Sequence, residues 1–398
     1  MRILTVGSMY PPHHLGGYEL MWESYVRHER AGGNEVRALC SDYRAPDPDR
    51  TVGGGDEDEG VSRDLRWYWR DHGFPRLGPG ARLRLERHNI ARLERELAEF
   101  RPDAVCWWAM GGMSMSLVEL VRRAGVPAAG AVVDDWLCYG PEVDGWQRMT
   151  ARWAATAAVA ERSFGVPTRL ELDSAARWLF ISETTRRRAR GAGRRGEGRI
   201  AHGGIDRALF PAAPARTWNW RLLYVGRIDR RKGVATAVRA VAELPAARLT
   251  IVGGGDEEHR AELEGLISRL GVGDRVSFQL HPRTALGRVY ADADAVLFPV
   301  VWEEPWGLVP LEGMSVGRPV VATGTGGSGE YLRDGENCLL FAPHEDPTAL
   351  ASAVVRLAGD EALRDRLRRA GFATAERFTE RAFNVAVGEE VRAAAAAA

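Results

Sequence analysis

The sequence has almost no lysine. Its 54 basic residues are all arginine except for Lys232. A chain that uses arginine wherever any cation suffices draws attention to the one position where a compact ammonium group is kept. We therefore treat Lys232 as a candidate functional residue. The alternative is a leftover surface lysine.

Cysteine pairs, long apolar runs and net charge are also lacking. The four cysteines stand far apart without a CxxC pair, which argues against a zinc site or a disulfide framework and fits a reducing compartment. No run approaches the roughly 18 apolar residues of a membrane span, and the N-terminus is typical of a strand rather than a signal peptide. The 54 acidic residues balance the 54 basic ones, so nucleic acid is not an expected partner. We expect a soluble, cytoplasmic protein.

The length of 398 residues predicts two or three domains, and 45% hydrophobic with 27% charged residues is a globular composition. Short apolar runs alternate with amphipathic stretches, which indicates βαβ units and parallel sheets covered on both faces. The first series of expected strands is 2–6, 35–40, 103–108, 128–133 and 178–182. The second series is 221–226, 247–253, 274–280, 294–299, 319–323 and 337–341.

These series predict two doubly wound, Rossmann-like α/β domains that bind a ligand in a cleft at the carboxyl ends of their strands. The Pro/Ala-rich stretch 211–219 is interpreted as a linker. The predicted domains are 1–210 and 220–377, with a final helix, 378–398, that packs back on the first domain.

Two polar segments stand apart from this pattern. Residues 44–60 are rich in Pro, Gly and acids, and both a lid over the acceptor and a plain loop are open alternatives. The arginine cluster at 186–199 favours a solvated helix end. Contact with an anionic membrane or an acidic partner is its less favoured alternative.

The first candidate site is a glycine turn. Gly16 and Gly17 follow the first strand and precede a helix that Gly32 and Gly33 should end, so backbone N–H groups at the helix start can meet an anion. The turn is not the GxGxxG fingerprint, and a tight strand-to-helix turn needs glycine in any case.

The second candidate site opens the second series. The strand 221–226 ends at Gly226, and Arg227 and Lys232 follow in the loop and the next helical turn. Two cations at this place can neutralise a diphosphate without a metal ion.

The third candidate site is the phrase WEEPWGLVPLE. Glu304 and Glu312 stand eight residues apart around a turn whose N–H groups, at Trp306, Gly307 and Leu308, can hold phosphate or sugar oxygens. A carboxylate one turn further in can accept both hydroxyls of a ribose. For Glu304 alone, an acidic residue that complements the helix dipole is the simpler interpretation.

With these phrases together, nearly the whole chain resembles the retaining glycosyltransferase family 4, of GT-B fold. The family's Glu-x7-Glu phrase corresponds to Glu304 and Glu312, and its GRxxxxKG phrase to residues 226–233. The PPxxxGG loop, the VGGG turn with Gly253, the GG-x-x-E element at 326–330 and GGID at 203–206 follow in the family's order.

The resemblance implies a role for each matched residue. Arg227 and Lys232 would bind the donor diphosphate and stabilise the departing nucleoside diphosphate. Glu304 would contact the donor sugar and Glu312 the ribose. The backbone near His281 would meet the base. The family works without metal, by front-face attack that retains the anomeric configuration.

Two positions depart from the family. Asp134, Asp135 and Trp136 stand where the family often has His-Asp, so Asp134 or Asp135 takes the place of a histidine that touches the donor sugar. An aspartate donates a hydrogen bond there only if its pKa is raised. Gly203 stands where asparagine is usual. Both departures affect the prediction of which sugar is transferred more than the prediction of the reaction class.

Three Asp-x-Asp phrases could suggest a metal site. They occur at 47–49, 56–58 and 292–294, and metal-dependent transferases of another fold use such a pair. We expect no metal here because the first two phrases lie in the loop. Aromatic rings can stack on sugars, and the first half holds Trp67, Trp69, Trp107, Trp108, Trp136 and Trp146. Of these, Trp136 is the one predicted to contact a sugar, from its place beside Asp134.

The sequence thus predicts a metal-independent, retaining hexosyltransferase that uses a nucleotide-sugar, UDP- or GDP-linked, with no further cofactor. The acceptor is a small molecule, an oligosaccharide or a lipid-linked molecule. The alternatives are a nucleotide-sugar epimerase on the same scaffold and a catalytically degenerate sugar-binding protein.

Overall fold

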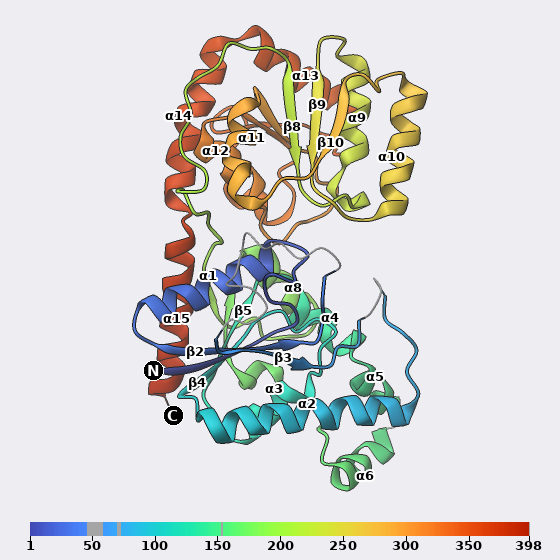
Figure 1. The fold of residues 1–398 in the computed structure, drawn as a ribbon, viewed down its shortest axis with the longest axis vertical. Helices are drawn as coiled ribbons and strands as arrows, with labels where there is room; N and C mark the ends of the chain where they lie inside the picture. The colour runs from blue at the N-terminus through green and yellow to red at the C-terminus, as the bar shows by residue number, and fades with distance from the viewer. Residues whose placement is uncertain (46–58, 70–72, 153, 398) are drawn as a thin grey trace. The chain divides into compact units, whose positions relative to one another are not determined.

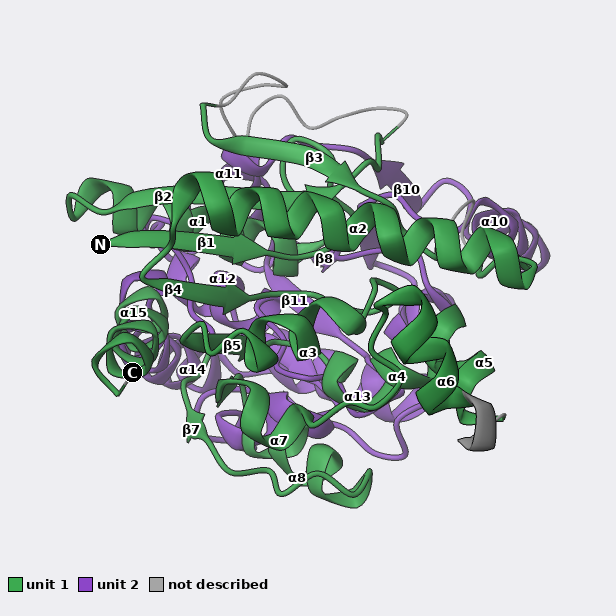
Figure 2. Ribbon diagram, turned by 90° about the horizontal axis from the view of Figure 1, so that it is seen from below, with its two compact units in different colours: residues 1–202, 383–398 green, residues 203–382 purple. Residues whose placement is uncertain are grey.

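A computed structural model describes residues 1–45, 59–69, 73–152 and 154–397. The chain forms two compact units, drawn in separate colours in Figure 2. Unit 1 comprises Met1–His202 and Phe383–Ala398, and unit 2 comprises Gly203–Ala382. The segment 211–219 lies within unit 2, where the Ala213 N–H donates to the Val316 carbonyl at 3.0 Å.

Unit 1 contains a parallel sheet whose seven described strands run in the order β3-β2-β1-β4-β5-β6-β7. The strands are β1 (Arg2–Val6), β2 (Glu35–Ser41), β3 (Val61–Leu65), β4 (Ala104–Trp107), β5 (Ala128–Val132), β6 (Arg177–Phe180) and β7 (Arg199–Ile200). All five predicted strands are present. The sequence analysis missed β3, whose VSRDL sequence is largely polar, and β7, which has two residues.

Helices cover both faces of this sheet; Figure 1 shows α1 on one face and α2 and α3 on the other. The helix α1 ends where Gly32 and Gly33 were expected to stop it, and Gly33 has φ +83°. The helices are α1 (Gly17–Ala31), α2 (Pro79–Phe100), α3 (Ser116–Arg123), α4 (Trp136–Val143), α5 (Gly145–Ala151), α6 (Ala154–Phe164), α7 (Leu172–Ala175), α8 (Glu183–Gly191) and α15 (Glu380–Ala396).

The last helix, α15, belongs to unit 1 from Phe383 onward, although the helix before it belongs to unit 2 (Figure 2). Its Asn384 amide donates to the Ser24 hydroxyl at 2.8 Å. Arg392 lies 3.4 Å from the buried carboxylate of Glu29. Both contacts attach α15 to α1.

Unit 2 contains a second parallel sheet, in the order β10-β9-β8-β11-β12-β13. Its strands confirm the six predicted runs: β8 (Arg221–Val225), β9 (Arg248–Val252), β10 (Val276–Gln279), β11 (Ala295–Phe298), β12 (Val320–Ala322) and β13 (Leu339–Leu340). Helices α9 and α10 cover one face, and α11, α12 and α14 the other (Figure 1). The helical elements are η1 (Arg230–Lys232), α9 (Val234–Glu243), α10 (Glu257–Leu270), η2 (Arg283–Ala285), α11 (Leu286–Asp292), α12 (Val309–Val316), η3 (Gly326–Glu330), α13 (Pro347–Gly359) and α14 (Glu361–Arg377).

Each sheet reverses its winding beside its first strand. In unit 1 the switch lies between β1 and β4, and in unit 2 between β8 and β11. The loops that leave the carboxyl ends of two such strands turn to opposite faces and leave a crevice, where doubly wound sheets bind ligands. The strand order therefore selects the loops after β8 and β11 as the place to look for a site in unit 2.

Unit 1 also buries a polar cluster under α2. Glu86 is fully buried, and its Oε1 accepts a hydrogen bond from the Tyr68 hydroxyl at 2.7 Å. Asp144, also fully buried, accepts the backbone N–H groups that begin α5. Burial first, and then the nearby Asp144 charge, raise the pKa of Glu86 to about 8.

No helix in the described part of the chain is long and apolar enough to cross a membrane.

Candidate functional site

The candidate site in unit 2 begins with a glycine turn after β8. Gly226 has φ +147°, and its N–H donates to the Val252 carbonyl at 3.0 Å. Gly253 has φ +139°, and a Cβ on it would lie 2.1 Å from the Gly226 carbonyl oxygen. The turns after β8 and β9 thus touch through their backbones, which requires glycine at both positions. The contact explains Gly226 and Gly253 without any ligand.

Lys232 lies at the end of η1 and pairs with Glu304 from the loop after β11. Its Nζ donates to Glu304 Oε1, and the two side chains are only 16% and 14% exposed. The structure therefore brings together two predicted residues that are 72 positions apart, one from each side of the switch point. The Gly233 that follows has φ +69°, and its added Cβ would lie 1.8 Å from the Pro299 carbonyl oxygen, so the two loops touch closely here.

Glu304 keeps one oxygen without a partner. Its Oε2 is buried and accepts no hydrogen bond from the described residues. A buried acceptor left unsatisfied carries a desolvation cost of about 1–3 kcal/mol. A ligand hydroxyl or N–H at this position would remove that cost.

Arg227 is an exposed cation in the loop after β8. Its side chain is 47% exposed, and its guanidinium lies 4.0 Å from Asp229. Asp229 is engaged mainly by Arg231, whose Nη2 donates to it at 2.8 Å. This hydrogen bond is the main cause that lowers the pKa of Asp229 to about 2. Arg231 also lies over the Trp302 ring at 4.7 Å, so Arg227 is the less engaged of these two arginines.

The GG-x-x-E element shapes the Glu304 loop. The Gly327 N–H donates to the Glu304 carbonyl at 2.7 Å. A Cβ on Gly326 would lie 2.4 Å from the same oxygen, and one on Gly327 2.0 Å from the Pro305 oxygen. This close backbone contact positions Glu304, which gives the two glycines a physical role.

The turn before α12 carries the other predicted backbone donors. Gly307 has φ +90°, and its carbonyl accepts the Tyr331 hydroxyl at 2.6 Å. The N–H groups of Gly307 and Leu308 donate to none of the described residues, so both are available to an oxyanion at the start of α12. The Trp306 side chain is buried, and its Nε1 donates to the Gly203 carbonyl at 2.9 Å.

Glu312 lies in the first turn of α12 and is 4% exposed. Its Oε2 accepts the Tyr290 hydroxyl at 2.6 Å, and its Oε1 lies 3.9 Å from Arg283 Nη1. Burial raises the pKa of this carboxyl above its ordinary value. Tyr290 thus engages Oε2, and the described residues make no hydrogen bond to Oε1. Tyr290 and Arg283 carry no motif that would have predicted this contact.

His281 follows β10 on the exposed edge of the sheet. Its Nε2 is 2.8 Å from Gln279 Oε1, and the neighbouring Leu280 is 70% exposed. The exposed leucine is compatible with the predicted contact to a base, but no contact among the described residues links His281 to Lys232 or Glu304.

The remaining predicted residues belong to unit 1. Gly16 precedes α1, and its N–H donates to the Glu19 carboxylate at 3.1 Å. Gly17 is the first helical residue. An acidic side chain thus already accepts one N–H at the predicted anion site, which weakens its capacity for a second anion.

Asp134 follows β5 and is half-buried. Its carboxylate accepts the Trp136 N–H at 2.9 Å and the Tyr139 hydroxyl at 2.8 Å. Burial raises its pKa to about 6. Asp135 instead pairs with Arg188 at 2.6 Å. In the structure Asp134 acts as an acceptor in both of its hydrogen bonds.

The prediction that Trp136 contacts a sugar is wrong. Its ring is fully buried, its Nε1 donates to the Tyr18 hydroxyl at 3.0 Å, and it packs edge-on against Trp178 at 5.5 Å. Burial of the large apolar surface of this indole in the core is favourable. Of the six tryptophans, Trp69 alone is half-buried, and the other five lie in the core.

The described residues contain no cluster of three or more His, Cys, Asp or Glu side chains suited to a metal. The pairs 47–49 and 56–58, with most of the segment 44–60, lie outside the described residues. Asp294 accepts the backbone N–H groups of Asn219 at 2.7 Å and Arg221 at 2.9 Å. The third Asp-x-Asp phrase therefore has a structural role at the amino end of β8.

The solved structures similar to this chain share both of its units. Sucrose-phosphate synthase from Thermosynechococcus elongatus matches all of both chains with a TM-score of 0.75 at 22% identity. The Anabaena HepE structure with UDP and glucose matches 99% of this chain and all of its own at 0.72 and 19%. At these identities the likeness establishes the fold. The protein has the GT-B fold, two Rossmann-like domains in one chain.

The sequence comparison is confined to part of the chain. Residues 207–374, within unit 2, match the family model "Glycosyl transferases group 1". D-inositol 3-phosphate glycosyltransferase of Acidothermus cellulolyticus is 36% identical over 201 residues, which is 45% of this chain and 44% of that protein. Glycogen synthase of Mycobacterium tuberculosis is 34% identical over 177 residues, 43% of this chain and 42% of its own. The match thus spans less than half the length of these relatives, and unit 2 carries a group 1 glycosyltransferase domain.

Proposed function

We propose that the protein is a glycosyltransferase that takes a hexose or modified hexose from a UDP- or GDP-sugar without a metal ion. One observation carries the proposal. The only lysine of the chain pairs with Glu304 at the carboxyl ends of β8 and β11, and Glu304 Oε2 is buried with no partner among the described residues.

The cations of this site suit a diphosphate. Lys232 presents a compact ammonium group held by Glu304, and Arg227 presents a planar, exposed guanidinium. The N–H groups of Gly307 and Leu308, which donate to none of the described residues, add two neutral donors. Fixed donors aimed at the charge that develops on a leaving group are usually the largest single contribution to catalysis. These groups make a metal ion unnecessary for charge neutralisation.

The acidic residues suit the sugar and the ribose. Glu304 Oε2 would accept a hydroxyl of the donor sugar, and Glu312 Oε1 a ribose hydroxyl, while the exposed Leu280 would lie against the base. UDP in the HepE structures and the sugar-transferring relatives support a nucleotide-sugar as donor. The acceptor is a small molecule, an oligosaccharide or a lipid-linked molecule.

In the proposed step, the acceptor hydroxyl oxygen bonds to the anomeric carbon from the side on which the carbon–phosphate oxygen bond breaks. The leaving phosphate oxygen takes the acceptor proton, and the anomeric configuration is retained. Arg227 and Lys232 hold the charge on the departing diphosphate. The chain supplies no nucleophile in this scheme.

The test is donor binding and hydrolysis with UDP-, GDP- and dTDP-sugars, with acceptors added in a second series. Glu312→Ala should weaken donor binding, and Lys232→Ala should nearly abolish turnover. Unchanged steady-state kinetics in both variants would overturn the assignment. Conversion of the donor to an isomer without acceptor would indicate an epimerase, and nucleotide binding with no turnover on any donor a degenerate binding protein.

A further inference from the structure

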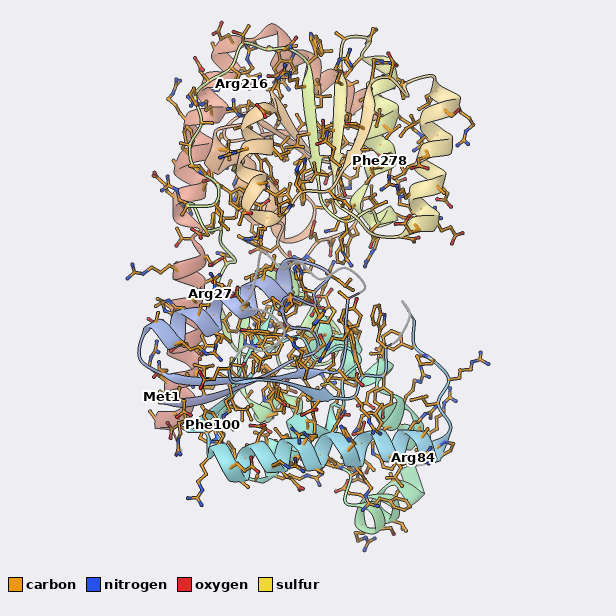
Figure 3. The ribbon with its side chains drawn as sticks, in the orientation of Figure 1. Met1, Arg27, Arg84, Phe100, Arg216 and Phe278 are labelled. Carbon is orange, nitrogen blue, oxygen red and sulfur yellow. The ribbon has the colours of Figure 1, made fainter. Side chains whose placement is uncertain are left out.

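Aromatic side chains gather at the carboxyl ends of the unit 1 strands. Tyr43 lies two residues after β2, and Trp67 and Trp69 follow β3. Phe74 lies on the segment that leads into α2, the helix that Figure 3 labels at Arg84. We call Tyr43, Trp67, Trp69 and Phe74 the aromatic platform. Loops at this edge of a doubly wound sheet bind ligands, and all four rings belong to unit 1.

Backbone hydrogen bonds hold the loops of the platform together. The Asp42 N–H donates to the Leu65 carbonyl at 2.7 Å, which joins the loop after β2 to the end of β3. The Tyr68 N–H, between the two platform tryptophans, donates to the Gly112 carbonyl at 3.0 Å, in the loop after β4. The platform therefore rests on three loops at one edge of the sheet.

Three of the rings contact one another. Trp67 and Trp69 have ring centroids 4.7 Å apart, and the Tyr43 ring stands edge-on at 5.9 Å from each. Trp67 is the base of the platform, because it is 7% exposed and its Nε1 donates to the Gly111 carbonyl at 3.0 Å. Tyr43 and Trp69 pack against the unit 1 core and are only partly buried, so each keeps some ring surface in solvent.

Phe74 extends the platform with a more exposed ring. Its side chain is 45% exposed. A Cβ on Gly112 would lie 3.0 Å from Phe74 Cε1 and 2.8 Å from Trp67 Nε1, so the two rings are neighbours across this glycine. Exposed apolar surface that joins several side chains marks a binding surface, whereas scattered single side chains do not.

A carboxylate borders the rings. A Cβ on Gly111 would lie 2.2 Å from the Tyr139 hydroxyl oxygen, so Gly111 connects the Trp67 indole to Tyr139. The Tyr139 hydroxyl donates to Asp134 at 2.8 Å. Asp134 is half-buried and uses about two of the four acceptor positions that a carboxylate offers. It therefore keeps capacity to accept hydroxyl groups of a ligand.

The hydroxyl of Tyr43 supplies a second polar group. It makes no hydrogen bond to the described residues. Burial first, and then the charge of the nearby Glu19, raise the pKa of Tyr43, so this hydroxyl stays protonated at neutral pH. A ligand on the platform thus meets aromatic surface together with a hydroxyl donor and a carboxylate acceptor.

These features favour one class of ligand. The contacting rings are inclined to one another by 38–84°, so they form no parallel slot for a flat aromatic molecule. An alkyl chain would use the rings and leave the polar groups without a role. A sugar ring matches both parts, because its C–H face packs on an aromatic ring and its hydroxyls need donors and acceptors.

We propose that the aromatic platform binds a sugar ring of the acceptor, so that the acceptor is a saccharide rather than a sugar-free molecule. The C–H face of this ring would pack on Trp69 and Phe74, and one of its hydroxyls would bond to Tyr43. The inference rests on the proposed function, which supplies the role of acceptor. The binding of the sugar itself is tested without any donor.

The experiment titrates the full chain with the methyl glycosides of glucose, galactose, mannose and N-acetylglucosamine, followed by saturation-transfer NMR. We expect at least one of them to bind with a millimolar Kd, with the strongest saturation on its ring C–H protons. Phenol and butanol should not compete, and the butyl glycoside of the same sugar should bind as tightly as the methyl glycoside. Binding of none of the four, competition by phenol, or tighter binding of the butyl glycoside would overturn the proposal.

Variants locate the binding on the platform. Trp69→Leu and Tyr43→Phe should each weaken glycoside binding about 3–10-fold, the range for loss of one ring contact or one hydrogen bond. Phe74→Leu should weaken binding, whereas Phe164→Leu, at a phenylalanine of α6 that is also 45% exposed, should leave it unchanged. Tyr43→Phe keeps the ring, so it tests the site even if Trp69→Leu folds poorly. Parent-like binding in all three platform variants would refute the site.

UDP binding in the same variants separates this inference from the proposed function. The platform variants should bind UDP like the parent, because the candidate donor site belongs to unit 2. UDP binding without binding of any glycoside would refute the platform and leave the transferase proposal standing. Glycoside binding without turnover of any nucleotide-sugar would refute the transferase and leave the platform as a sugar-binding site.

Discussion

The Lys232–Glu304 pair allows stability and catalysis to be separated. Among the described residues, Lys232 is the one hydrogen-bond partner of Glu304 Oε1, and Oε2 has none. Lys232→Ala therefore leaves this carboxylate without compensation from them. Loss of one partner from a buried pair costs about 3–5 kcal/mol. Because the side chains are still 16% and 14% exposed, we expect the lower end, about 3 kcal/mol.

The effect on unfolding follows from the size of unit 2. For a unit of its length, 1 kcal/mol shifts the midpoint by about 2–4 °C, so Lys232→Ala should lower the midpoint of unit 2 by about 6–12 °C. Turnover should fall about 10²–10³-fold, the usual loss on removing one fixed donor to a developing negative charge. Thermal unfolding and donor turnover measure the two effects independently.

A double variant supplies the decisive comparison. Lys232→Ala/Glu304→Ala removes the uncompensated carboxylate, so most of the lost stability should return while turnover stays low. Arg231→Ala is the matched control, because this neighbouring cation is 53% exposed and pairs with Asp229 instead; it should cost under about 1 kcal/mol. A double variant less stable than Lys232→Ala, or a single variant with turnover within about threefold of the parent, would refute the reasoning.

Two further predictions concern folding. Burial raises the pKa of Glu86 to about 8, so the folded state holds this proton more tightly than the unfolded state, and stability should fall as pH rises from about 4.5 to 8. Glu86→Gln should therefore be more stable than the parent at pH 9 and lose that advantage by pH 5, in denaturant unfolding, while Glu94→Gln on the exposed side of α2 should follow the parent. Gly253→Ala should destabilise unit 2 by several kcal/mol, on the order of other strained backbone sites, because its Cβ would lie 2.1 Å from the Gly226 oxygen. Gly254→Ala, where the nearest atom is the Leu280 side chain at 3.7 Å, should change the midpoint little, and similar losses in both variants would contradict the steric explanation.

Elements with a strong local signal were predictable from sequence. The strands that run between helices are continuous apolar runs, and Gly32–Gly33 ends α1 because glycine adopts the left-handed backbone at low cost. The strand β3 was missed because VSRDL has little apolar content and owes its pairing to β2. The sequence of a short segment does not show which distant strand it will pair with.

The same limit applies to the site. The phrases around Lys232 and Glu304 were visible in the sequence, but their hydrogen bond depends on strand order, with β11 beside β8. Tyr290 as the partner of Glu312, and Tyr139 as the partner of Asp134, follow from packing and had no sequence signal. Trp136 was misjudged for the converse reason: its place beside Asp134 in sequence does not say which way its ring points, and the core buries it.

The scarcity of lysine has a practical chemical consequence. Lys232 carries the only side-chain primary amine in the sequence, and that amine is held by Glu304 and largely shielded from solvent. Reagents that acylate lysines, and enzymes that acetylate or conjugate them, therefore have one side-chain target in the protein. The rate at which this amine reacts therefore reports on whether its ion pair with Glu304 is formed. A reagent that modifies lysine side chains can thus label the candidate site selectively.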